Sequence, residues 1–125
     1  MSKKLAFWEK DPSPDDLNAA RLYLTMVLSP EAARKALSQF QRVSNTLLEA
    51  KDVLRASDLP LLEEDEPKVA EVVRRIEKKK KLSPVLLLRG DARKGVPMTV
   101  ADGYHRICGS FYFDKKCPVA CRIIS

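Results

Sequence analysis

The sequence predicts a single α+β domain, a small mixed sheet with packed helices preceded by a helical N-terminal segment. Helical spacing of apolar residues dominates the first half, strand-like apolar runs appear only in the second half, and a glycine turn joins one of those runs to a further helix. At 125 residues the chain has room for one core but not for two independent ones. We therefore expect a helical N-terminal extension, residues 1–50, packed as one unit with residues 51–125.

Two helix starts mark the N-terminal extension. Ser13 is a good N-cap and Pro14 suits the first helical position. The apolar residues that follow at helical spacing are Leu17, Ala20, Leu24 and Val27. The Ser29-Pro30 pair repeats the start signal and predicts a second helix to about Arg42. Its apolar face consists of Ala33, Ala36, Leu37 and Phe40.

Two further helices are predicted before the first strand. Apolar spacing in residues 47–54 indicates a third, shorter helix before the break at Ser57-Asp58-Leu59-Pro60. Acids and a proline at Asp65-Glu66-Pro67 then start a fourth helix, which should run to about Lys80. The apolar residues on one face of this fourth helix are Val69, Val72, Val73 and Ile76.

The strands fall in the last third of the chain. The continuous apolar run at 84–88 predicts a buried strand, and 98–101 predicts the next one after a charged loop at 90–95. A short helix over 106–113 and a closing strand over 119–124 complete the expected order, which is helix, strand, strand, helix, strand.

The segment from 99 to 110, TVADGYHRICGS, points most directly to function. Its strand ends at Asp102-Gly103, and its helix opens at Tyr104. The first N–H groups of a helix have no partner within it, and the helix dipole favours an anion there. His105 and Arg106 lie at that position, which therefore predicts an anion site.

Structural roles for the same residues remain open. Asp102 would also suit a simple turn, because Asp-Gly is common in turns of any fold. His105 would also suit a surface position, and Arg106 would also pair with a carboxylate of the acidic run 63–66. That run is itself either a solvated helix start or a source of a general base or Mg²⁺ ligand near phosphates.

Charge is distributed unevenly along the chain. Residues 1–66 hold 9 Lys/Arg and 12 Asp/Glu, whereas residues 67–125 hold 14 and 5, so the halves carry −3 and +9. The basic half contains the glycine turn and would attract phosphates, of a nucleotide or of nucleic acid. The run Lys78–Lys81 is its strongest cluster, although lysines also complement the dipole at the end of a helix.

Composition argues against a membrane protein, a secreted protein and a metal-binding protein. No apolar run approaches the roughly 20 residues of a membrane span, and the N-terminus lacks the apolar stretch of a signal peptide, so we expect a cytoplasmic protein without a membrane partner. The 3 cysteines are an odd set, with Cys117 and Cys121 about 13 Å apart if both lie in a strand. With 1 histidine in the chain, we expect buried thiols and no metal site.

Four segments occur in an order that resembles the ParB/sulfiredoxin superfamily. They are Leu59-Pro60, Glu66-Pro67-Lys68-Val69, Pro84-Val85-Leu86-Leu87 and Asp102-Gly103-Tyr104-His105-Arg106. Members share an acidic-Pro loop, a helix, an apolar strand after proline, a second strand and a Gly-x-His-Arg or Gly-x-Arg-Arg turn that caps a short helix. The resemblance covers about residues 55–124 and implies the same small mixed sheet.

The resemblance also implies nucleotide binding. In this superfamily the His-Arg pair and the backbone of the turn hold the phosphates of ATP, ADP or CTP, here with Mg²⁺. Lys68 falls where sulfiredoxins carry a phosphate-contacting lysine. The implied binding residues are Lys68, Asp102, Gly103, Tyr104, His105 and Arg106.

Departures from the superfamily narrow the expected activity. Tyr104 stands where sulfiredoxins carry their reactive cysteine, and the given chain ends at Ser125, before the second box and helix-turn-helix of ParB proteins. The free-serine kinases have an Asp before the turn, as Asp102 stands here, so a small-molecule phosphotransferase or nucleotide hydrolase stays open. The alternatives are a nucleic-acid-binding ParB-like module using the basic half, and a non-catalytic partner-binding protein. The N-terminal helices would equally suit a homodimer face.

Overall fold

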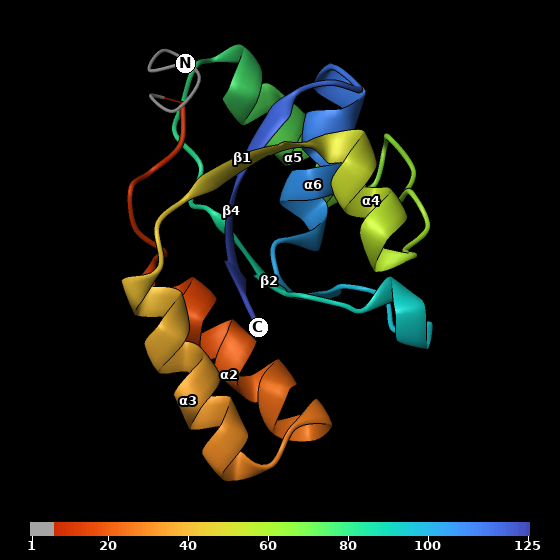
Figure 1. Ribbon diagram of the computed structural model, residues 1–125. Coiled ribbons are helices and arrows are strands. Elements are labelled where there is room, and N and C mark those ends of the chain that lie inside the picture. Colours follow the sequence, from red (N-terminus) through yellow and green to blue (C-terminus); the bar gives the residue numbers. More distant parts are fainter. Residues whose placement is uncertain (1–6) are drawn as a thin grey trace.

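The computed structural model describes residues 7–125 and confirms the α+β class. A mixed four-stranded sheet lies between two groups of helices (Figure 1). The elements are α2 (Pro14–Val27), α3 (Pro30–Arg42), β1 (Thr46–Glu49), α4 (Ala50–Ser57), α5 (Pro67–Glu77), β2 (Val85–Leu88), the 3₁₀ turn η1 (Ala92–Lys94), β3 (Thr99–Asp102), α6 (Tyr104–Phe113) and β4 (Pro118–Ile124).

The sheet has the strand order β1-β4-β2-β3. β4 runs antiparallel to β1 and parallel to β2, and β2 runs antiparallel to β3. A parallel neighbour requires a crossover, which here passes through β3 and α6 before the chain returns as β4. This crossover places the turn between β3 and α6 beside the central strand.

Two hydrophobic cores cover the two faces of the sheet. Val85 and Leu87 of β2 belong to the core formed with α4, α5 and α6, while Leu86 between them belongs to the core formed with α2 and α3. In Figure 1 the α2–α3 hairpin and the other three helices lie on different sides of β2 and β4. Because both faces of β2 are buried, its sequence shows a continuous apolar run and no alternation.

The local start signals in the sequence are confirmed. The Ser13 hydroxyl accepts the Asp16 N–H at 3.1 Å, and the Ser29 hydroxyl accepts the Ala32 N–H at 3.2 Å. The predicted starts of α2 and α3 and the predicted end of α3 match the structure. α5 is shorter than expected, because it ends at Glu77 and the chain adopts a left-handed conformation at Lys79, where φ is 57°.

The helix expected over 47–54 is wrong in its first half. Thr46–Glu49 form the edge strand β1, and only the part from Ala50 onward is helical. The leucines of β1 suit either periodicity, and pairing with the distant β4 decides in favour of the strand. The boundary drawn after residue 50 therefore falls one residue inside α4, and the N-terminal extension contributes a strand as well as helices.

Arg122 of β4 joins the sheet to the N-terminal segment. Its side chain is 5% exposed, and all five of its N–H donors have acceptors. These acceptors are the Asn45 Oδ1 and the backbone oxygens of Phe40, Gln41 and Lys10, together with a carboxylate oxygen of Asp11. The guanidinium therefore ties the end of α3 and residues 10–11 to β4.

Arg122→Met should lower the free energy of unfolding by on the order of 3 kcal/mol, because it leaves buried carbonyl oxygens without donors. Urea denaturation followed by circular dichroism measures the change. Arg42→Met is the matched control: Arg42 is exposed, and its loss should change stability by less than about 0.5 kcal/mol. Equal losses in both variants would contradict the role assigned to Arg122.

Candidate functional site

Glycine is required at the turn between β3 and α6. Gly103 caps α6 with a φ of 113°, and a Cβ built there would lie 2.7 Å from the Cβ of Val85. No side chain makes a capping hydrogen bond to this helix start. The first N–H groups of α6 are therefore placed to receive an acceptor from outside the helix.

The start of α6 opens on a cleft of about 430 Å³. Four of the predicted residues line it, namely Asp102, Gly103, His105 and Arg106. Other charged groups reach the same cleft from α2, from α5 and from the segment before β2; they include Asp16, Arg75 and Lys81. The turn thus forms one wall of a larger site whose remaining walls come from distant parts of the chain.

Arg106 pairs with carboxylates other than those considered from the sequence. Its Nη1 donates to the Asp16 Oδ2 at 2.9 Å and to the Ser83 carbonyl oxygen at 2.8 Å. Its Nη2 donates to the Asp102 Oδ2 at 2.7 Å. The side chain is 13% exposed, and two carboxylates balance its charge. The primary contacts of Arg106 are therefore internal, and its contact with a phosphate stays a prediction.

The two carboxylates beside Arg106 differ in their protonation. Burial raises the pKa of Asp102 to about 6, against the opposing effect of Arg106, and the nearby charge of Asp16 raises it further. Burial also acts to raise the pKa of Asp16, but the charge of Arg106 and hydrogen bonds outweigh it, so that this pKa is lowered. Asp16 is thus the ionised partner of Arg106, and Asp102 is the group that exchanges a proton near neutral pH.

His105 lies at a more open position than Arg106. Its side chain is 40% exposed, and its Nε2 is 3.6 Å from the Glu66 Oε2. Glu66 also caps α5 by accepting the Val69 N–H at 3.0 Å. The last acid of the run 63–66 therefore has a structural role, and the other three are exposed, as a solvated helix start would be.

Two predicted residues lie outside the cleft. Lys68 is exposed on the first turn of α5, and the cleft lining does not include it. The Tyr104 hydroxyl donates to the Pro60 carbonyl oxygen, which anchors the loop before α5. The sequence offered Lys81 only as part of the run Lys78–Lys81, and it did not point to Asp16 or Arg75. Asp16 has a sufficient explanation as an acid in the first turn of a helix and lies 90 residues from Arg106.

Comparisons with family models, with curated proteins and with solved structures gave no match for this chain. Over residues 7–125, no helix has the length and apolarity of a membrane span. No group of three or more His, Cys, Asp or Glu side chains in that range is arranged as metal ligands would be. Cys108 and Cys121 are buried as expected, while Cys117 is half-buried.

The raised pKa of Asp102 makes stability depend on pH. The pKa of Asp102 is about 6 in the folded protein and 3.8 as the ordinary value, so the folded state binds this proton more tightly. The resulting stabilisation is complete below about pH 3.8 and disappears as the pH rises through 6. The unfolding free energy of the native chain, minus that of Asp102→Asn, should fall by on the order of 2 kcal/mol between about pH 4 and about pH 7.

Urea denaturation at a series of pH values measures this difference. Carbon-13 NMR of the aspartate carboxyl groups provides a direct check, since a resonance titrating near pH 6 should be absent from Asp102→Asn. Parallel stability curves for the two proteins would contradict the assignment.

Proposed function

We propose that the cleft at the start of α6 binds the phosphate groups of a nucleotide such as ATP, ADP or CTP. The observation that supports this most strongly is the helix start at Gly103, which has no side-chain cap and opens on the cleft. A phosphate there accepts hydrogen bonds from backbone N–H groups and is favoured by the helix dipole. The cleft volume of about 430 Å³ falls in the usual range of ligand pockets, about 300–1,000 Å³.

In this proposal Arg75 and Lys81 make the charged contacts to phosphate that the sequence suggested for Arg106. The Arg75 Nη2 donates to the Lys81 carbonyl oxygen at 3.0 Å, which holds both residues at one edge of the cleft. Within residues 7–125, neither forms an ion pair with a carboxylate. Their charges remain available to an anion, whereas Arg106 holds Asp16 and Asp102 in place in the cleft wall.

Asp102 supports an enzymatic form of the proposal. A carboxyl group with a pKa of about 6 in a cleft is suited to accept a proton near neutral pH. In the proposed reaction, the bond between the terminal phosphorus and its bridging oxygen breaks, a bond to the oxygen of a hydroxyl compound or water forms, and Asp102 accepts the displaced proton. This corresponds to a small-molecule phosphotransferase or a nucleotide hydrolase.

Mg²⁺ does not fit a protein-held position in the cleft. The two carboxylates nearest the helix start, Asp16 and Asp102, are both engaged by Arg106. Among residues 7–125 no further set of acidic or histidine side chains is grouped for a metal. Mg²⁺ would therefore enter bound to the nucleotide phosphates, as it commonly does.

The order α5, β2, β3, α6 and β4 supports the remaining part of the proposal, membership of the ParB/sulfiredoxin superfamily. It reproduces the helix, strand, strand, helix, strand order of that superfamily, with the Gly103 turn at the start of the second helix.

Isothermal titration calorimetry with ATP, ADP and CTP, each with and without Mg²⁺, tests the binding. The double variant Arg75→Gln/Lys81→Gln should weaken binding about tenfold or more, because two charge-assisted contacts are lost. Lys79→Gln/Lys80→Gln is the matched control: it removes the same charge from outside the cleft and should leave nucleotide affinity unchanged.

Two results would overturn the proposed function. One is the absence of binding heat with every nucleotide. The other is a salt-dependent mobility shift with DNA that both double variants weaken alike, which would favour the nucleic-acid-binding alternative.

A further inference from the structure

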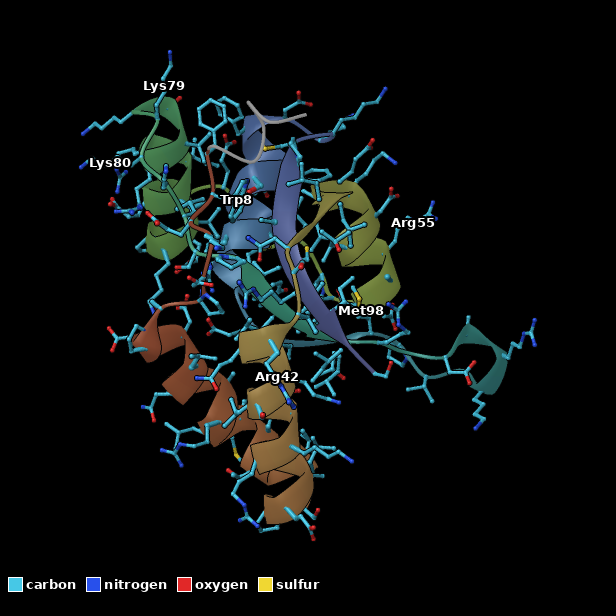
Figure 2. All side chains as sticks on the ribbon, turned by 60° about the vertical axis from the view of Figure 1, so that its left-hand side comes forward. Trp8, Arg42, Arg55, Lys79, Lys80 and Met98 are labelled. Atoms are coloured by element: carbon cyan, nitrogen blue, oxygen red, sulfur yellow. The ribbon has the colours of Figure 1, made fainter. Side chains whose placement is uncertain are left out.

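A second concave site lies at the C-terminal end of α5, apart from the cleft. It is an apolar pocket of about 380 Å³, and its walls include Trp8, Ile76, Leu82 and Phe113. In Figure 2 Trp8, Lys79 and Lys80 all lie in the part of the molecule around this end of α5. The pocket shares Leu82 with the cleft but none of its charged residues.

The pocket is built from three separate segments. Residues 7–9 run beside Leu82, where the Glu9 N–H donates to the Leu82 carbonyl at 2.7 Å and the Leu82 N–H donates to the Phe7 carbonyl at 3.2 Å. Phe113 at the end of α6 provides another wall, together with Pro118 at the start of β4. Phe7 and Phe113 are 45% and 49% exposed, a large apolar exposure at the edge of one pocket.

Charge gathers at one side of this apolar pocket. Lys79 and Lys80 are among its lining residues, and Glu77 is the one acid among them. Lys79 adopts a φ of 57°, a left-handed conformation that costs a residue other than glycine roughly 1 kcal/mol. The reversal ends α5 and turns the chain so that both lysines border the pocket. The balance of charge at this border is positive.

We propose that this pocket binds a single-chain amphiphile with an anionic head, the chemical class of the fatty acids. The alkyl chain lies against the apolar walls, and the carboxylate pairs with the ammonium groups of Lys79 and Lys80. The pocket has the volume of a ligand site, an apolar lining and a few polar groups at one side, which is the usual construction for small molecules. A concave pocket suits one inserted chain better than the flat surface of a membrane.

Trp8 provides the signal for the test, because it is the 1 tryptophan of the sequence and lines the pocket. The full chain is titrated with sodium dodecanoate below its micelle concentration, and tryptophan emission is followed. We expect a saturable change. Dodecanol, the uncharged probe of equal chain length, should bind more weakly, and butanoate should produce no change.

Variants separate the contributions of charge and apolar surface. Lys79→Gln/Lys80→Gln should weaken dodecanoate binding about tenfold and leave dodecanol binding unchanged, since only the charged contacts are lost. Phe113→Ser should weaken the binding of both probes. Because this side chain is half-exposed, the substitution should leave the fold intact. Arg75→Gln/Lys81→Gln, the cleft variant, is the matched control and should bind dodecanoate normally.

Three outcomes would overturn the inference. They are an emission change that does not saturate, equal binding of dodecanoate by the native chain and by Lys79→Gln/Lys80→Gln, and binding to phosphatidylglycerol vesicles without any response to monomeric dodecanoate. The last would indicate a membrane surface as the occupant. Because the nucleotide titration uses a different cleft and the opposite pair of double variants, its failure and the failure of this inference are distinguishable.

Discussion

The bridge from Arg106 to Asp16 and Asp102 is the interaction on which the site and much of the fold depend. It joins α2 to the turn between β3 and α6, two parts of the chain that share no sequence neighbourhood. Without the guanidinium, two largely buried carboxylates would face each other with no counter-charge, an arrangement that a protein interior penalises strongly. Arg122 makes a comparable bridge on β4, so that two arginines fasten the N-terminal segment to the sheet.

This bridge also decides how the cleft distributes its charge. A guanidinium held by two carboxylates contributes little net attraction to an incoming anion, and so the positive field of the cleft comes from Arg75, Lys81 and the start of α6. Within this bridge, burial raises the pKa of Asp102 to about 6 against the opposing effect of Arg106. One cluster thus has a structural and a chemical role. Arg106 maintains the shape of the cleft, and the Asp102 carboxyl group remains able to exchange a proton.

The lysine run after α5 serves two surfaces. Lys81 lines the cleft, whereas Lys79 and Lys80 border the apolar pocket. The left-handed backbone at Lys79 lies where the chain leaves the helix and passes from the pocket to the cleft. A helix continuing to Lys80, as the periodicity suggests, would have spread consecutive lysines around the helix axis at about 100° per residue. The strongly basic second half of the chain is therefore divided between two concave sites of different chemistry, one polar and one apolar.

Local sequence patterns were enough to predict the α+β class, the starts of α2, α3 and α5, the buried character of β2 and the glycine turn before α6. Each of these rests on contacts within about one helical turn or on periodicity, which a linear chain displays directly. Long-range packing was needed to establish that Thr46–Glu49 form a strand, that Asp16 pairs with Arg106, and that Lys68 and Tyr104 lie outside the cleft. Those outcomes depend on which distant segments become neighbours, because pairing in a sheet and burial of a charge are set by partners that the local sequence does not contain.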